Sequence, residues 1–154
     1  MPKDDDNVER DVALNRRAYH DYFVDEKFEA GMVLTGPEVK SLRAGRCNLR
    51  DGFVRVDGRE AWLENVHISP YVQANAMNTE PMHPRKLLLH KKQIASLIGR
   101  VRQKGYTLIP LRVYFKRNHA KLEVGLCRGK RQFDKREAMA ERDAKREIER
   151  ATRR

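Results

Sequence analysis

A β-hairpin is predicted by the stretch FVRVDGREAWL, which occupies residues 53–63. Its two halves, 53–56 and 60–63, are rich in β-branched and aromatic residues. They flank the pair Asp57-Gly58, which favours a type I′ turn between antiparallel strands. Val66 and Ile68 are expected to extend the second strand as far as Pro70, which cannot donate a ladder hydrogen bond. The stretch therefore predicts an antiparallel sheet.

Further strands are predicted on both sides of this hairpin. Aromatic and β-branched residues cluster within 19–28, and after Gly31 the segment 32–34 resumes as a bulged strand. Segments 107–116 and 121–127 form two more strands, joined across residues 117–119. Pro110 predicts an edge or a bulge in the first of these. The sheet therefore draws strands from most of the chain.

Two helices are predicted between the strands. Thr35 is a suitable N-cap with Glu38 three residues later, and Gly45 is a suitable left-handed terminator. The second helix has one apolar stripe at the spacing i, i+3, i+4 and i+7, formed by Ile94, Leu97, Ile98 and Val101. Residues 71–84 have no stable periodicity and are expected to form a loop.

These elements predict a mainly β (α+β) fold. An OB-like antiparallel β-barrel with about three helices, over residues 13–128, protects strand edges that an open sheet would expose. Residues 1–12 are acidic and are expected to be disordered. Residues 129–154 form a basic tail with a thin apolar stripe, so we expect it to be disordered when free and helical against a partner.

The positive charge is concentrated in one part of the chain. The sequence has 33 Lys and Arg against 22 Asp and Glu, a formal net charge of +11. Eleven of the basic residues and none of the acids lie within 81–122, so this window holds the whole excess. Such a window attracts a polyanion and binds it through counterion release. Nucleic acid is the favoured partner, and a solvated basic face with no partner is the alternative.

Several other functional classes are disfavoured by the sequence. No apolar run approaches the ~20 residues that span a bilayer, and no signal peptide follows Met1. Cys47 and Cys127 are too few and too far apart for a disulfide framework or a zinc site. The five histidines show no metal-ligand spacing, and no Gly-rich phosphate loop follows a strand. We therefore expect a cytoplasmic, non-enzymatic protein without metal, cofactor or membrane contact.

Five separated motifs occur in an order that is typical of one family. They are FEAG with GPEVKSLRAG (28–31 and 36–45), RKLLL (85–89), GRV (99–101), GYT (105–107), and GKR with DKR (129–131 and 134–136). NRRA at 15–18 and His20 match the start of the same family. From about residue 14 to residue 136 the chain resembles the small protein B (SmpB) family, the bacterial partner of transfer-messenger RNA (tmRNA).

The resemblance implies a fold and a function. Members of the family have an OB-like barrel and a C-terminal tail that is disordered in isolation. They bind the tRNA-like domain of tmRNA and deliver it to stalled ribosomes for trans-translation, which rescues the ribosome and tags the peptide. The implied partners are tmRNA and the small ribosomal subunit, at its decoding centre and mRNA channel. We expect a monomer, one per tmRNA, that carries out no chemistry itself.

The resemblance and the charge pattern together name candidate contacts. Glu29, Leu88 and Lys121 match positions that the family uses at its RNA face. Glu29 can accept from a base amine or a 2′-hydroxyl, or orient an arginine such as Arg43. Candidate phosphate contacts are Lys40, Arg43, Arg46, Arg85, Lys86, Lys91 and Lys92. Candidate ribosome contacts in the tail are Gly129, Lys130, Arg131, Phe133, Asp134, Lys135 and Arg136.

The tail departs from the family pattern at two positions. Family members often have a histidine where this chain has Phe133, and a tryptophan where it has Ala144.

Two other classes of protein stay open beside the SmpB-like interpretation. A ribosomal or assembly protein would co-sediment with every subunit, whereas a generic single-strand-binding OB module would prefer unstructured RNA. A tmRNA partner should instead bind one-to-one to a folded tRNA-like arm.

Overall fold

The computed structural model of this chain describes residues 8–71, 78, 80–130, 142, 145, 146, 148 and 150. The elements within those residues follow one another along the chain. They are β1 (Glu9–Leu14), α1 (Arg16–Asp21), β2 (Tyr22–Met32), α2 (Gly36–Arg43), β3 (Cys47–Asn48), β4 (Phe53–Asp57), β5 (Glu60–Glu64), β6 (His67–Ile68), β7 (Arg85–Leu88), α3 (Lys91–Lys104), β8 (Thr107–Lys116) and β9 (His119–Gly129).

One antiparallel sheet dominates the fold. Its seven strands have the order β1-β8-β9-β2-β7-β5-β4, and β3 and β6 form a separate short pair. The predicted antiparallel, mainly β architecture with three helices is confirmed, but a closed barrel is not found in the described residues. Strand β8 is hydrogen-bonded on both sides, to β1 and β9, so β4 lies close to it without joining it in the sheet. The ladder therefore remains an open sheet that ends at β1 and β4.

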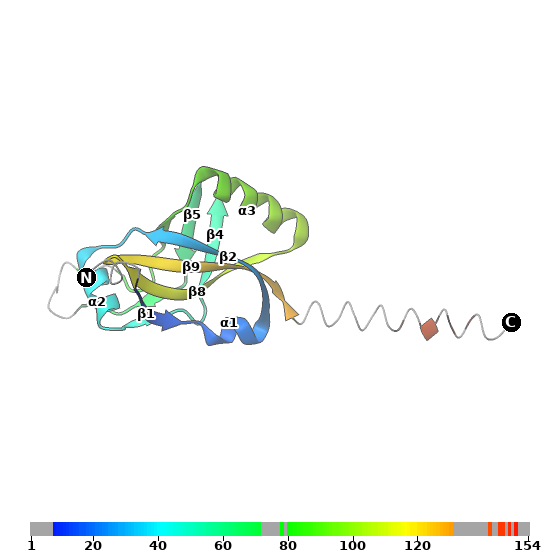
Figure 1. Cartoon of the computed structure of the whole chain (residues 1–154), viewed down its shortest axis with the longest axis horizontal. Coiled ribbons are helices and arrows are strands. Elements are labelled where there is room, and N and C mark those ends of the chain that lie inside the picture. Colours follow the sequence, from blue (N-terminus) through cyan, green and yellow to red (C-terminus); the bar gives the residue numbers. More distant parts are fainter. Residues whose placement is uncertain are drawn as a thin grey trace.

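The strongly twisted sheet encloses most of the core. Figure 1 shows β4 and β5 crossing the long strands β2, β9 and β8 at a steep angle. Leu63 of β5 and Leu122 of β9 belong to one buried cluster, which also contains Ile94 and Leu97 of α3. The stripe predicted at Ile94, Leu97, Ile98 and Val101 is thus the face with which α3 packs, and Gly105 ends this helix with φ of 66°.

The predicted hairpin is present, with a different turn. Strands β4 and β5 pair from Phe53 with Glu64 to Asp57 with Glu60, so the turn residues are Gly58 and Arg59. Only Gly58 of these two has positive φ, whereas a type I′ turn requires it at both positions. The predicted extension of β5 to Ile68 is wrong. Asn65 has φ of 59°, which ends β5 and directs β6 to pair with β3.

The bulge predicted at Pro110 is confirmed. The register between β8 and β9 shifts between Pro110 and Arg112. The interruption predicted at Gly31 is absent, since β2 runs through Gly31 to Met32, and the bulge in β2 lies between Val24 and Glu26 instead.

The N-terminal strand corrects the prediction for the start of the chain. Residues 1–12 were expected to be disordered, but β1 begins at Glu9 and pairs with β8. Arg112 donates to carboxylates of Glu9 at 2.9 Å and Asp11 at 2.7 Å, while Val12 packs against the core. The acidic residues are thus ordered because one arginine neutralises two of them. Residues 1–7 lie outside the described residues.

The helix caps have the predicted chemistry. Thr35 N–H donates to Oε1 of Glu38 at 3.0 Å, and Glu38 N–H donates to the Thr35 hydroxyl at 3.4 Å. Helix α1 was not predicted. Asn15 caps it, accepting from Ala18 N–H at 3.2 Å, and its amide also donates to the carbonyls of Leu49 and Pro110. Residues 72–77 and 79 of the predicted loop at 71–84, and most of the tail, lie outside the described residues.

We expect Gly52→Ala to destabilise the fold. A Cβ at Gly52 would lie 2.5 Å from Cγ2 of Val66 and 3.0 Å from Cγ of Pro110, so the core must shift to admit it. Overpacking of this kind costs about 1–3 kcal/mol. The matched control is Gly99→Ala, because no atom lies within 4 Å of its Cβ and alanine is the better helix former. Chemical denaturation should give opposite signs for the two variants, and equal stability for Gly52→Ala and the wild type would contradict this packing.

Candidate nucleic-acid interface

Three predicted site residues from distant parts of the sequence meet on neighbouring strands. Strand β2 lies between β9 and β7, and Gly31 is the register partner of both Lys121 and Leu88. Glu29 precedes Gly31 by two residues and therefore faces the same side of the sheet. Glu29, Leu88 and Lys121 all line one hollow of about 500 Å³. We call it the β2–β7 hollow; its other lining residues include Gly31, Lys86, His90 and Lys91.

Leu88 lies on the outside of the sheet. Its neighbour in β7, Leu87, is 2 % exposed within the core, whereas Leu88 is 56 % exposed. A Cβ at Gly31 would lie 3.2 Å from Cβ of Leu88, so the glycine leaves room beside this side chain. An apolar group exposed in this way can pack against the flat face of a base or a sugar.

Glu29 is held by groups of β8. The Tyr114 hydroxyl donates to Oε2 of Glu29 at 2.7 Å, and Nζ of Lys116 lies 3.4 Å from the same oxygen. The Tyr114 hydrogen bond lowers the pKa of Glu29 from its ordinary value; burial opposes this, and the charges of Lys116 and Lys121 support it. In the described residues Glu29 bonds with Tyr114 and Lys116 and not with Arg43, which lies over the ring of Phe115, 5.1 Å from its centroid.

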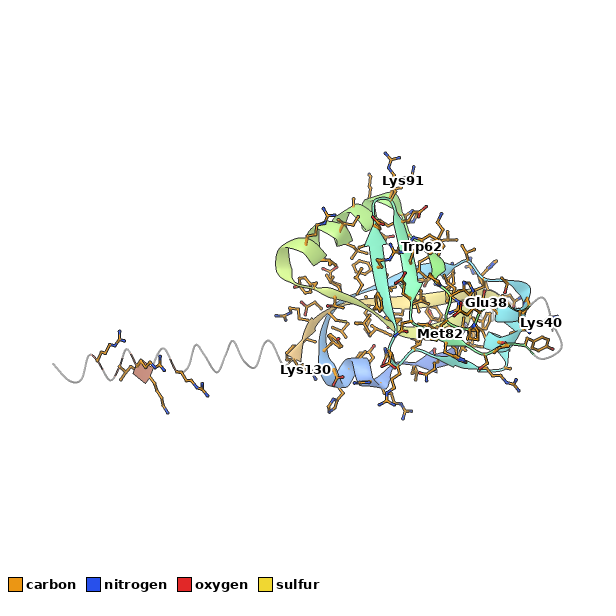
Figure 2. All side chains as sticks on the ribbon, turned by 180° about the vertical axis from the view of Figure 1, so that it is seen from behind. Glu38, Lys40, Trp62, Met82, Lys91 and Lys130 are labelled. Carbon is orange, nitrogen blue, oxygen red and sulfur yellow. The ribbon has the colours of Figure 1, made fainter. Side chains whose placement is uncertain are left out.

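The candidate phosphate contacts divide into two groups. Lys86 and Lys91 line the β2–β7 hollow, and Lys92 is exposed beside them at the start of α3. Lys40, Arg43 and Arg46 are exposed on α2 and just after it. Figure 2 shows Lys40 and Lys91 at well-separated parts of the molecule. One bound nucleotide therefore cannot contact both groups, although a folded RNA can extend across a surface of this size.

Arg85 does not fit its predicted role as a phosphate contact. Its side chain is 1 % exposed, and its guanidinium donates to Oε2 of Glu38 at 2.6 Å. It also donates to the carbonyls of Val66 at 2.5 Å and Pro81 at 2.8 Å. Figure 2 shows Glu38 among packed side chains. A charge held inside by three acceptors is not available to an RNA phosphate.

The buried pair keeps Glu38 ionised. Burial disfavours the carboxylate, but the Thr35 N–H and the Arg85 guanidinium outweigh it and hold the pKa of Glu38 below its ordinary value. Nε2 of His83 lies 3.1 Å from the same carboxylate. The motif residues Glu38 and Arg85 therefore join α2 to β7 and to the segment before it.

The start of the tail is attached to α1 and β2. Nζ of Lys130 donates to the Tyr19 carbonyl at 3.0 Å and lies 5.3 Å from the centroid of the Phe23 ring. Gly129 is the last residue of β9 and pairs with Tyr22. The other predicted tail contacts, Arg131, Phe133, Asp134, Lys135 and Arg136, and the departure at Ala144 lie outside the described residues.

Sequence reasoning missed Tyr114 and Lys116 as members of the site. Both alternate with Arg112 along β8, a pattern that predicts a shared face of the strand. Nothing in the sequence pairs that face with Glu29, which is 85 residues away from Tyr114. The pairing depends on β9, which lies between β8 and β2.

The chain was compared with known families and proteins. The profile described as SmpB protein matches residues 12–154. The chain belongs to the SmpB family. The SsrA-binding protein of Carboxydothermus hydrogenoformans is 59% identical over 146 residues, covering 95% of this chain and 98% of the relative. The SsrA-binding protein of Bacillus cytotoxicus is 54% identical over 153 residues, covering 99% and 97% of the two chains.

A solved structure supports the same assignment. The SmpB-family fold described above resembles a chain reported as "tmRNA-SmpB: a journey to the center of the bacterial ribosome". The TM-score is 0.65 and the identity 50%, over 77% of this SmpB-family chain and 83% of the other. Among the residues that the structure describes, no helix is long and apolar enough to cross a membrane.

Proposed function

We propose that this chain binds the tRNA-like domain of tmRNA and accompanies it to stalled ribosomes for trans-translation. The observation that carries the proposal is the convergence of Glu29, Leu88 and Lys121 on one exposed hollow, in a chain of the SmpB family. Its relatives include SsrA-binding proteins, and a solved chain with a similar fold was reported as "tmRNA-SmpB: a journey to the center of the bacterial ribosome". The protein works in the bacterial cytoplasm by binding, without catalysing a reaction.

The chemistry of the hollow suits a folded RNA. Lys121, Lys86 and Lys91 attract phosphates, Leu88 offers an apolar surface, and Glu29 accepts from a hydroxyl or an amine. Recognition of a folded RNA by shape, phosphate contacts and unpaired bases needs this mixture of groups.

The cations of the hollow should control the salt dependence of RNA binding. The slope of log affinity against log salt is negative, and each phosphate contact that is lost reduces its magnitude by about 0.7–0.9. We expect this change for Lys121→Ala with the tRNA-like domain as the ligand. The control is Arg50→Ala, because Arg50 is exposed but does not line the β2–β7 hollow. Fluorescence titrations over a range of salt concentrations measure both slopes, and an unchanged slope for Lys121→Ala would exclude it as a phosphate contact.

The tail should act after tmRNA is bound. We expect a chain that ends at residue 130 to bind the tRNA-like domain with nearly wild-type affinity, because the β2–β7 hollow and the Lys130 contact with Tyr19 are both retained. Peptide tagging on stalled ribosomes should be abolished, since the basic tail is then absent from the mRNA path. The measurement is tagging in a reconstituted translation system beside a binding titration. Undiminished tagging by the shortened chain would refute the role of the tail.

A further inference from the structure

Glu29 places a negative charge among groups that otherwise suit phosphate. Lys116 and Lys121 stand beside it, and Lys86 and Lys91 line the same hollow. A carboxylate repels phosphate but accepts hydrogen bonds from neutral donors. Oε2 of Glu29 is occupied by Tyr114 and Lys116, and in the described part of the chain no hydrogen bond reaches Oε1. One oxygen is therefore left to accept from a ligand.

Burial and a contact with Arg112 restrain the side chain of Tyr114. The residue is 2 % exposed, and the Arg112 guanidinium lies 4.0 Å from its ring centroid. Arg112 is bound in turn by Glu9 and Asp11 of β1 and by Glu123 of β9, at 2.7 to 3.0 Å. The side chain of Tyr114 therefore has little freedom to move, and its hydroxyl donates to Glu29 from a fixed position. Such preorganisation reduces the ordering that binding must impose on Glu29.

We propose that Tyr114 is a positioning residue that fixes Glu29 so that Oε1 accepts a hydrogen bond from the bound RNA. The donor is a ribose 2′-hydroxyl or a base N–H, and this contact makes the centre of the hollow selective for a donor group over a phosphate. The inference rests on the proposed RNA-binding function and adds a specificity contact to it. The neighbouring lysines bind the flanking phosphates. Glu29 recognises a hydrogen-bond donor of the RNA, which attraction between opposite charges cannot distinguish.

The charges around Glu29 agree with an acceptor-only carboxylate. Tyr114, Lys116 and Lys121 keep its pKa low, so the group is ionised at neutral pH. The register partner of Glu29 on the neighbouring strand β9 is Glu123. The carboxylate of Glu123 is bound by Arg112 at 3.0 Å and lies 3.6 Å from Nζ of Lys27. The carboxylate of Glu29 thus remains the open acceptor on this face of β2.

A double-mutant cycle tests the positioning role. Affinity for the tRNA-like domain is measured for the wild type, Tyr114→Phe, Glu29→Gln and the double variant, with melting curves to confirm that each is folded. We expect Tyr114→Phe to bind about tenfold more weakly, the usual effect of a lost hydrogen bond to a charged group. It should cause no further loss in the Glu29→Gln background, because the two residues act as one unit.

A matched control is available elsewhere on β2. Tyr106 also makes a hydrogen bond to a carboxylate, that of Asp25, but neither residue lines the β2–β7 hollow. Tyr106→Phe should leave the affinity unchanged. Carboxyl NMR titration should show the pKa of Glu29 rising in Tyr114→Phe, which verifies that the substitution has removed the hydrogen bond to Glu29. An equal loss from Tyr114→Phe in both Glu29 backgrounds overturns the inference and leaves RNA binding intact, whereas a wild type that binds no RNA overturns the proposed function and this inference together.

Analogue interference distinguishes the two donor sources. One pool of tRNA-like domains carries random 2′-deoxy substitutions, and a second pool carries inosine for guanosine and purine riboside for adenosine. Bound molecules are sequenced for the wild type and for Glu29→Ala. We expect one position at which an analogue weakens binding to the wild type but not to the variant, and the pool that contains it identifies the donor. Identical interference patterns for the two proteins would overturn the specificity contact.

Discussion

Arg85→Met should unfold at a much lower temperature than the wild type. Removing the guanidinium leaves the Glu38 carboxylate buried, at 5 % exposure, without the partner that lies 2.6 Å away. The carbonyl of Val66 loses the Arg85 donor as well, while that of Pro81 keeps only its hydrogen bond from the Ile68 N–H. Breaking a buried ion pair from one side costs about 3–5 kcal/mol. That is a large share of the roughly 5–15 kcal/mol that stabilises a typical protein, so the effect should exceed that of any surface change.

The loss of unfolding free energy caused by Arg85→Met should be larger at neutral pH than at acidic pH. Because folding lowers the pKa of Glu38, its contribution to stability is full above the ordinary pKa of a glutamate and is lost as the pH falls through the lowered value. In Arg85→Met the carboxylate lacks Arg85, so its pKa should rise and protonation should relieve the buried charge. The difference in unfolding free energy between the wild type and the variant should therefore be larger at pH 7 than at pH 4.

A second substitution separates this charge effect from lost packing. Glu38→Gln removes the charge and retains an oxygen that can accept from the Thr35 N–H. Glu38→Gln combined with Arg85→Met should be more stable at pH 7 than Arg85→Met alone. Chemical denaturation of the three chains at both pH values measures these differences. A double variant no more stable than Arg85→Met would mean that the buried charge of Glu38 does not cause the loss.

Leu88→Asp should abolish most binding to the tRNA-like domain without unfolding the protein. Leu88 is 56 % exposed, so the substitution removes little from the core. It places a carboxylate in the β2–β7 hollow, where we expect phosphates to approach, and removes the apolar surface. Like charges brought together in an interface cost several kcal/mol. Affinity should fall about a hundredfold, since each 1.4 kcal/mol or so is a factor of ten.

The chain offers a closely matched control for this substitution. Leu14 is 53 % exposed at the end of β1 and does not line the β2–β7 hollow. Leu14→Asp introduces the same charge with a similar loss of apolar surface, so its affinity should stay within a fewfold of the wild type. Isothermal titration with the tRNA-like domain compares the two. Equal losses for Leu88→Asp and Leu14→Asp would indicate general charge repulsion and would exclude Leu88 as a local contact.

The sequence predicted those parts of the fold that depend on local chemistry. The capping box of Thr35 and Glu38, the left-handed end at Gly45 and the bulge at Pro110 follow from the preferences of single residues. The openness of the sheet could not be found in this way. It depends on which strands occupy both sides of β8, and that pairing is set by contacts between residues far apart in the chain.

The same limit applied to the site. The alternation in β9 predicts that Lys121 faces outward, and the family resemblance selected it together with Glu29 of β2 and Leu88 of β7. Arg85 was placed wrongly because a cation in a basic segment resembles a phosphate contact. Only the structure shows that its partner is Glu38, 47 residues earlier. Tyr114 was missed because its role depends on the register that brings β8 and β2 to either side of β9.

A competition binding assay tests the central claim most directly. Labelled tRNA-like domain of tmRNA is bound to the full chain at ~150 mM salt, where longer-range charge effects are screened. It is then challenged with intact tRNA, unstructured RNA and a random duplex. We expect tight one-to-one binding that only RNA with the tRNA-like fold displaces. Equal displacement by every RNA would mean that the basic surface binds by charge alone, and it would contradict the proposed recognition of tmRNA.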